Sequence, residues 1–125
     1  QPDFVINCAG ILVKGSVDNI KNAILINSYL PHFISEIMGN TCKFIHVSTD
    51  CVFDGKAGGY KENEDVSPID IYGRTKSLGE IINNNNVLTI RTSIIGLEIS
   101  KHKTGLLEWF LKEEETINGP IFQRR

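Results

Sequence analysis

The stretch KFIHVSTD, residues 43–50, joins a short apolar run to three polar residues. Residues 43–47 predict a buried strand, and residues 48–50 follow at the point where that strand would expose its carboxyl end. Two similar apolar runs occur at residues 4–8 and 87–91. The sequence therefore predicts three short strands of the buried, parallel kind.

Helical patterns separate these runs. Between residues 18 and 38 apolar side chains recur at helical spacing, with Asp18 as the expected N-cap and Gly39 as the stop. Pro31 is expected to kink or split this helix, because proline has no backbone N–H to donate. A second helix is expected around residues 70–82.

The order of these elements predicts the fold class. Strands that alternate with helices form right-handed crossovers, so we expect an α/β fold with a doubly wound parallel sheet and helices on both faces. Ligands bind such sheets beyond the carboxyl ends of the strands, which indicates the loops at residues 7–10, 48–50 and 92–96. An apolar stripe at residues 106–111, before acidic residues 113–115, predicts a further packed helix with a solvated end.

Composition narrows the class of protein. With 125 residues, 41% hydrophobic and 22% charged, the chain is predicted to be one soluble globular domain or part of one. A net charge of -2 without a basic cluster argues against nucleic acid, and no apolar run approaches the roughly 20 residues that cross a membrane. The cysteines form no CxxC pair and the histidines have no partners at metal-ligand spacing, so we expect a cytoplasmic location and no metal site.

Two motifs carry residues that can perform acid–base chemistry. Tyr72 and Lys76 are four residues apart, so on a helix they project from the same face. An ammonium beside a phenol lowers the phenol pKa toward neutrality, which suits a general acid or base; the alternative is an exposed helix face without a catalytic duty. The Thr49 hydroxyl could hydrogen bond a substrate carbonyl, or it could only cap the local backbone.

The joint spacing of several motifs resembles one family. The motifs are HVSTDCVFDG at residues 46–55, the segments 7–10, 72–76 and 91–93, and the single residues Tyr60, Glu62 and Pro68. Over roughly residues 2–112 they resemble the dTDP-4-dehydrorhamnose reductase family of the extended short-chain dehydrogenase/reductase superfamily. Cys51 departs from the pattern, because many relatives have an aromatic residue there. The resemblance implies a Rossmann-like, NAD(P)-binding fold.

The resemblance also implies a role for each matching residue. Tyr72 would protonate the keto oxygen as hydride arrives from the nicotinamide, and Lys76 would hold the nicotinamide ribose while lowering the tyrosine pKa. Thr49 would orient the carbonyl, and Ser48 is the second candidate for this role. The implied cofactor-binding residues are Asn7, Ala9, Gly10, Ser48, Thr92 and Ser93. The first three would line the ribose and diphosphate, and the last two the nicotinamide side.

By the same resemblance, the expected activity is NAD(P)H-dependent reduction of a 4-keto nucleotide sugar in rhamnose and polysaccharide biosynthesis, with NADPH favoured and a homodimer as the assembly. The alternatives are an epimerase or dehydratase of the same superfamily, a non-catalytic subunit like the regulatory subunit of methionine adenosyltransferase, and a truncated remnant. Reductase, epimerase and dehydratase would share the same Thr, Tyr and Lys side chains.

The family's opening strand, glycine-rich turn and C-terminal substrate domain have no counterpart in residues 1–125. The chain is therefore expected to be an internal fragment, a partial dinucleotide-binding domain that is inactive alone and does not by itself distinguish NAD from NADP. Such a half sheet would leave one edge unpaired and one apolar face uncovered.

Overall fold

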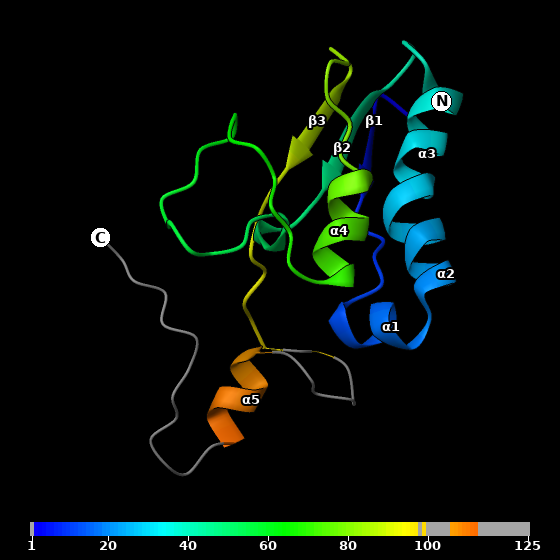
Figure 1. The fold of residues 1–125 in the computed structure, drawn as a ribbon. Helices are drawn as coiled ribbons and strands as arrows, with labels where there is room; N and C mark the ends of the chain where they lie inside the picture. The colour runs from blue at the N-terminus through cyan, green and yellow to red at the C-terminus, as the bar shows by residue number, and fades with distance from the viewer. Residues whose placement is uncertain (1, 98, 100–105, 113–125) are drawn as a thin grey trace.

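The computed structural model describes residues 2–97, 99 and 106–112. Its centre is a sheet of three parallel strands in the order β1-β2-β3 (Figure 1). The strands are β1 (Phe4–Asn7), β2 (Lys43–Val47) and β3 (Val87–Ile90). The prediction of three parallel strands is confirmed, and the bounds of β2 agree with those expected.

Two helical crossovers connect the strands. The first consists of α1 (Val13–Asp18), α2 (Ile20–Ala23), the π-helical segment η1 (Ile24–Tyr29) and α3 (Leu30–Met38). The second consists of the 3-10 turn η2 (Asp50–Val52), a long loop and α4 (Ile71–Leu78), and α5 (Leu106–Lys112) follows β3. The acidic residues 113–115, expected to end α5, lie outside the described residues.

The first crossover starts differently from the prediction. Residues 13–18 form the separate helix α1, and the next helix is capped by Asn19 rather than Asp18. The Asn19 side chain accepts a hydrogen bond from the Asn22 backbone N–H at 3.0 Å, which satisfies one of the free donors at a helix start. Asp18 instead pairs with Lys14 on the surface. Both residues are good N-caps, and sequence spacing alone does not choose between them.

The split expected at Pro31 takes the form of a change in helix type. Pro31 lies at the start of α3, where its missing N–H is tolerated, and the preceding turn is π-helical. The carbonyl of Asn27, to which a residue at position 31 would normally donate, lies against Gly79 instead, and a Cβ on Gly79 would lie 1.9 Å from that oxygen. Gly39 ends the crossover with a φ of 51°, as expected for a glycine stop.

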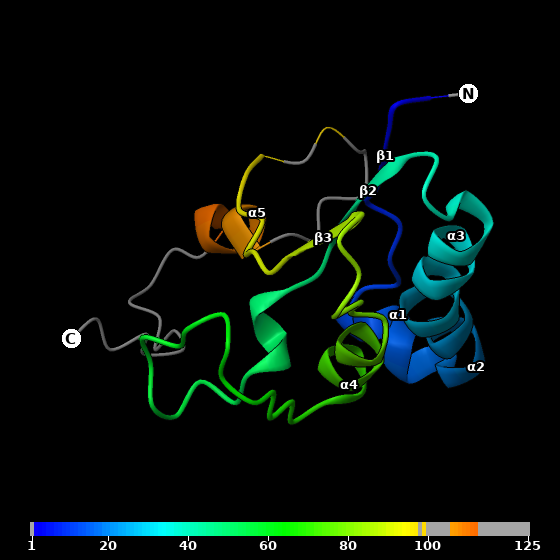
Figure 2. The same cartoon turned by 90° about the horizontal axis from the view of Figure 1, so that it is seen from above.

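The two faces of the sheet differ. Helices α1 to α4 lie on one side of it (Figure 2), where Phe44 and His46 of β2 are fully buried. On the opposite face Phe4, Ile6 and Leu88 are exposed by 64%, 61% and 57%. The predicted α/β class with a parallel sheet is confirmed, but the described helices α1 to α4 cover one face of the sheet rather than the two that were expected. Within the described residues, no helix is long and apolar enough to span a membrane.

Candidate active site

The N-cap residue Asp70 and the glycine Gly73 place helix α4 against the end of β2. The Asp70 carboxylate accepts from the Gly73 N–H at 2.7 Å and starts the helix. Gly73 then packs directly on the backbone of η2, because a Cβ there would lie 2.2 Å from the Cys51 carbonyl oxygen. This close approach brings Tyr72, the residue before Gly73, to Thr49 at the carboxyl end of β2.

Thr49 is buried and makes the local capping contact that the sequence offered as one alternative, whereas its contact with a substrate carbonyl stays a prediction. Its Oγ1 accepts from the Cys51 N–H at 3.2 Å and donates to the Asp50 carboxylate at 3.1 Å, so it caps η2. Its hydroxyl also lies near Tyr72 and acts to lower the pKa of the phenol. Burial raises the pKa of the Cys51 thiol, which keeps that neighbour in its neutral form.

The net pKa shift of Tyr72 is opposite to the one expected from sequence. Burial is the largest cause and raises the pKa of Tyr72. Cys51 and the carboxylates of Asp50 and Asp70 raise it further, whereas the nearby Thr49 hydroxyl lowers it. The phenol therefore carries its proton at neutral pH. The effect of Lys76 on Tyr72 in the presence of a cofactor stays a prediction.

Lys76 is buried one helical turn after Tyr72. Its Nζ donates to the Val47 carbonyl at 2.7 Å, which ties α4 to the last residue of β2. Burial lowers the pKa of the ammonium, and the Glu80 carboxylate opposes that shift. An ammonium has three N–H donors and the bond to Val47 uses one of them.

The loop after β1 borders this lysine. Asn7 is buried and shapes the loop, because its Oδ1 accepts from the Ala9 N–H at 3.1 Å. Its amide nitrogen then faces Nδ1 of His46 at 3.2 Å and donates to it. Ala9 and Gly10 are exposed, and a Cβ on Gly10 would lie 4.0 Å from Lys76 Nζ. A group placed on this open loop would reach the ammonium, so the residues present fit a cofactor ribose.

His46 holds Asn7 as a neutral imidazole. Its pKa is lowered to about 4, first by burial and then by the charge of Lys76. Since Asn7 donates to Nδ1, the ring proton is on Nε2, which is buried without a hydrogen-bond partner among the described residues. His46 was expected to be a strand residue and is one, on the helix-covered side of β2.

Asn27 is a candidate positioning residue that the sequence reasoning missed. It is fully buried in η1, where its Oδ1 accepts from the Ile11 N–H at 2.7 Å. Its Nδ2 donates to the Ile11 carbonyl at 3.0 Å and to Thr75 Oγ1 at 3.1 Å. Asn27 therefore joins the loop after β1 to α4 between Tyr72 and Lys76. The available signal was a polar residue within an apolar helical pattern.

The third predicted loop also reaches the site. The Ser93 hydroxyl donates to the Asp50 carboxylate, and Thr92 is half-buried beside it, with its hydroxyl 3.4 Å from the Ser93 carbonyl. The residues that follow β3 are therefore fastened to η2, next to Thr49. All three loops expected at the carboxyl end of the sheet contribute residues to one region.

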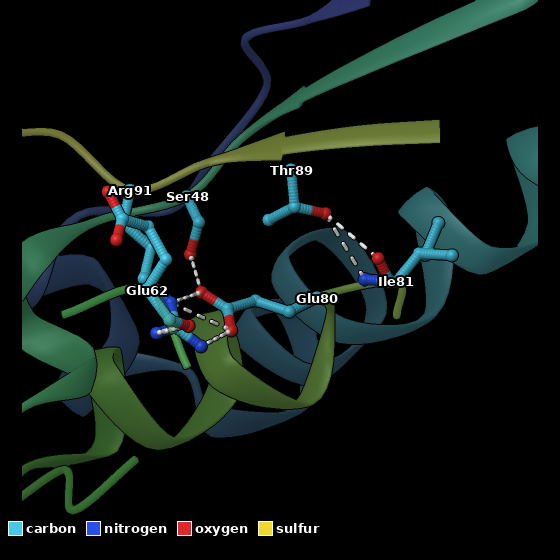
Figure 3. A network of polar contacts seen from close by, with 6 residues as sticks. All are labelled: Ser48, Glu62, Glu80, Ile81, Thr89 and Arg91. Atoms are coloured by element: carbon cyan, nitrogen blue, oxygen red, sulfur yellow. Dashed lines mark hydrogen bonds and ion pairs between the residues drawn. The ribbon is translucent and has the colours of Figure 1, made fainter. Parts of the chain in front are cut away.

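Ser48 forms a hydrogen bond within the protein. Its hydroxyl is buried and donates to Glu80 Oε1 at 2.7 Å. Glu80 in turn forms an ion pair with Arg91, whose Nη2 lies 2.7 Å from Oε2 (Figure 3). The roles in catalysis and cofactor binding that were assigned to Ser48 and to the other site residues remain predictions.

Several known proteins are similar to this chain in sequence and in structure. A dTDP-4-dehydrorhamnose reductase of Mycobacterium tuberculosis is 36% identical over 85 residues, which are 62% of this chain and 28% of that protein. The crystal structure of a dTDP-4-dehydrorhamnose reductase from Bacillus anthracis in complex with NADP matches with a TM-score of 0.63 and 30% identity, over 71% of this chain and 34% of that one.

A dTDP-4-dehydrorhamnose reductase structure from Clostridium acetobutylicum matches with a TM-score of 0.66 and 31% identity, over 73% of this chain and 35% of that chain. The chain thus spans about a third or less of each of these relatives. The family model described as the RmlD substrate binding domain matches residues 1–117. The chain therefore belongs to the RmlD substrate binding domain family, and its predicted resemblance to the dTDP-4-dehydrorhamnose reductases is confirmed.

Proposed function

We propose that the complete protein reduces the keto group of a 4-keto nucleotide sugar, with NADPH as the favoured reductant. The observation that carries this proposal is the contact between Thr49 and Tyr72, with Lys76 one turn away, at the carboxyl ends of β1 and β2. The reductases that share its family, one of them solved with NADP, support the substrate class and the cofactor.

Tyr72 is the proton donor in this proposal. A phenol whose pKa is raised by burial carries a proton at neutral pH, as a general acid must. Thr49 lies near Tyr72, so a keto oxygen that contacts both hydroxyls would be oriented by Thr49 and protonated by Tyr72. The cofactor supplies the hydride when it is bound. The carbonyl becomes an alcohol, with one hydride on carbon and one proton on oxygen.

Lys76 and the loop after β1 would hold the cofactor. The exposed backbone of Ala9 and Gly10 leaves room for a ribose, and the Lys76 ammonium has donors beyond the one that binds Val47. Asn7 keeps this loop in place through its bond to the Ala9 N–H. Thr92 and Ser93 would contact the nicotinamide side.

The test is reduction of a dTDP- or UDP-linked 4-keto-6-deoxy sugar by the complete protein, followed as the loss of NADPH absorbance, with NADH in parallel. Tyr72→Phe should lower kcat on the order of 100-fold or more, because it removes the proton donor. Tyr29→Phe is the matched control, since Tyr29 is exposed and stacks only on Phe33 among the described rings. Full turnover in Tyr72→Phe would refute the assigned role.

Two other outcomes of this test would favour a different function. Cofactor that stays bound while the sugar is epimerised or dehydrated, with no net NADPH oxidation, would favour an epimerase or dehydratase. Cofactor binding without turnover of any nucleotide sugar, unchanged in Tyr72→Phe, would favour a regulatory subunit.

A further inference from the structure

Glu80 lies on the same side of the α4 segment as the two proposed active-site residues. Tyr72, Lys76 and Glu80 follow one another at four-residue spacing, and the Glu80 N–H bonds the Ser77 carbonyl at 3.2 Å, so the turn continues beyond the helix. Its position is defined by Gly79, which packs on the Asn27 carbonyl with no space for a Cβ. The carboxylate is thereby directed at the ends of β2 and β3.

The Glu80 carboxylate joins both strand ends. Its side chain is only 6% exposed, and Oε1 accepts from the Ser48 hydroxyl at 2.7 Å and from Arg91 Nε at 2.9 Å. Oε2 accepts from Arg91 Nη2 at 2.7 Å. Figure 3 shows Ser48 and Arg91 converging on Glu80 from the two strands. Such a two-pronged arginine–carboxylate pair constrains direction as well as distance.

Arg91 extends the connection to the long loop between η2 and α4. Its Nη1 donates to the Glu62 carbonyl at 3.3 Å, and its guanidinium lies 5.0 Å from the centre of the Phe53 ring. Phe53 stacks on Tyr60 with ring centres 4.4 Å apart. Glu80 thus connects α4, two strand ends and this loop through one carboxylate.

This arrangement restrains the chain immediately before Thr49. The residue before it, Ser48, is bonded through its hydroxyl to Glu80 and through its N–H to the Ile90 carbonyl at 2.7 Å. Val47 is bonded to Lys76. Two consecutive residues at the strand end are therefore fastened to residues 76 and 80, which belong to α4 and the turn after it, and Tyr72 lies on the same helix.

We infer that Glu80 is a positioning residue that, through Ser48 and Arg91, holds Thr49 in register with Tyr72 and Lys76. This inference rests on the proposed function and assigns Ser48 to the support of Thr49 rather than to cofactor contact. A pair that served stability alone could be replaced by other side chains that restore the melting temperature, whereas a positioning pair requires this geometry.

The experiment is a double-mutant cycle in the complete protein, with Ser48→Ala, Glu80→Gln and the double variant, measured as kcat and as KM for NADPH. Glu80→Gln should lower kcat by roughly 10- to 100-fold with little change in KM, the expected effect of a shift of about 1 Å at the reacting groups. Ser48→Ala should lower kcat in the same direction. The double variant should lose no more than Glu80→Gln alone, because both changes break one connection.

Asp18→Asn is the matched control, since it also turns the carboxylate of an ion pair into an amide, but in an exposed pair with Lys14. Its kcat should equal that of the unaltered protein.

If Glu80→Gln does not fold, Arg91→Lys replaces it, because lysine keeps the charge but loses the two-pronged geometry. An unchanged kcat in folded Glu80→Gln or Arg91→Lys overturns the inference. A higher KM for NADPH with unchanged kcat in Ser48→Ala also overturns it and makes Ser48 a cofactor ligand.

Amide hydrogen exchange separates this inference from the proposed function. The Ser48 N–H should exchange faster in Glu80→Gln than in the unaltered protein or in Asp18→Asn, whether or not the protein reduces a sugar. Unchanged exchange at Ser48 refutes the positioning role. Faster exchange without any turnover by the unaltered protein supports the positioning role and refutes the reductase proposal instead.

Discussion

Gly73→Ala tests how the position of α4 determines the Thr49–Tyr72 contact. In an ordinary helix this change stabilises by about 1 kcal/mol. Here the new Cβ would lie 2.2 Å from the Cys51 carbonyl oxygen and 3.0 Å from Pro68 Cβ. A Cβ atom makes ordinary contact with another heavy atom from 3.4 Å. The new Cβ is about 1.2 Å closer to the Cys51 oxygen than that, so the helix must move by about this distance. Overpacking of this kind typically costs about 1–3 kcal/mol, which outweighs the gain.

The expected result is a lower melting temperature and a kcat reduced on the order of 100-fold, because Tyr72 adjoins Gly73 and a 1 Å displacement of reacting groups has roughly that effect. The assay is thermal unfolding together with NADPH oxidation by the complete protein. Gly15→Ala is the control, since its Cβ would meet only the Cγ2 atom of Ile11, at 2.9 Å, and that side chain can rotate. Gly73→Ala with unchanged kcat and stability would refute the close-packing argument.

Two further predictions concern buried polar residues. Asn27→Leu removes three hydrogen bonds and leaves the Ile11 N–H without its acceptor, so it should destabilise the fold by about 1–3 kcal/mol in urea unfolding; an unchanged midpoint would contradict this. The pKa of His46 falls from 6.5 to about 4 on folding, so the unfolded state binds the proton more readily and stability should decline as the pH falls from 6.5 toward 4. The loss should approach about 3 kcal/mol and should disappear in His46→Gln, as measured by unfolding at a series of pH values.

Short-range patterns predicted the elements that depend on neighbouring residues. The apolar run of β2 and the polar residues after it predicted a strand and the position of Thr49, because a buried strand needs only a few consecutive apolar side chains. The four-residue spacing likewise predicted that Tyr72 and Lys76 share one helix. The family resemblance was also contained in these local motifs.

Local patterns were less informative where two choices were equally good. Asp18 and Asn19 are adjacent, and both are good helix caps; the structure uses Asn19, because Asp18 belongs to the preceding helix α1. The π-helical turn before Pro31 likewise depends on how that helix packs on the turn at Gly79.

By itself the sequence determined the three strands, their parallel class, the motif residues and the loops of the candidate site. Only the tertiary structure decided that Ser48 bonds to Glu80, that Asn27 bridges to Thr75, and that burial raises the pKa of Tyr72. The physical reason is separation along the chain. The two hydrogen bonds join residues 32 and 48 positions apart, and the burial of one phenol is the sum of packing by several segments. No local periodicity contains that information.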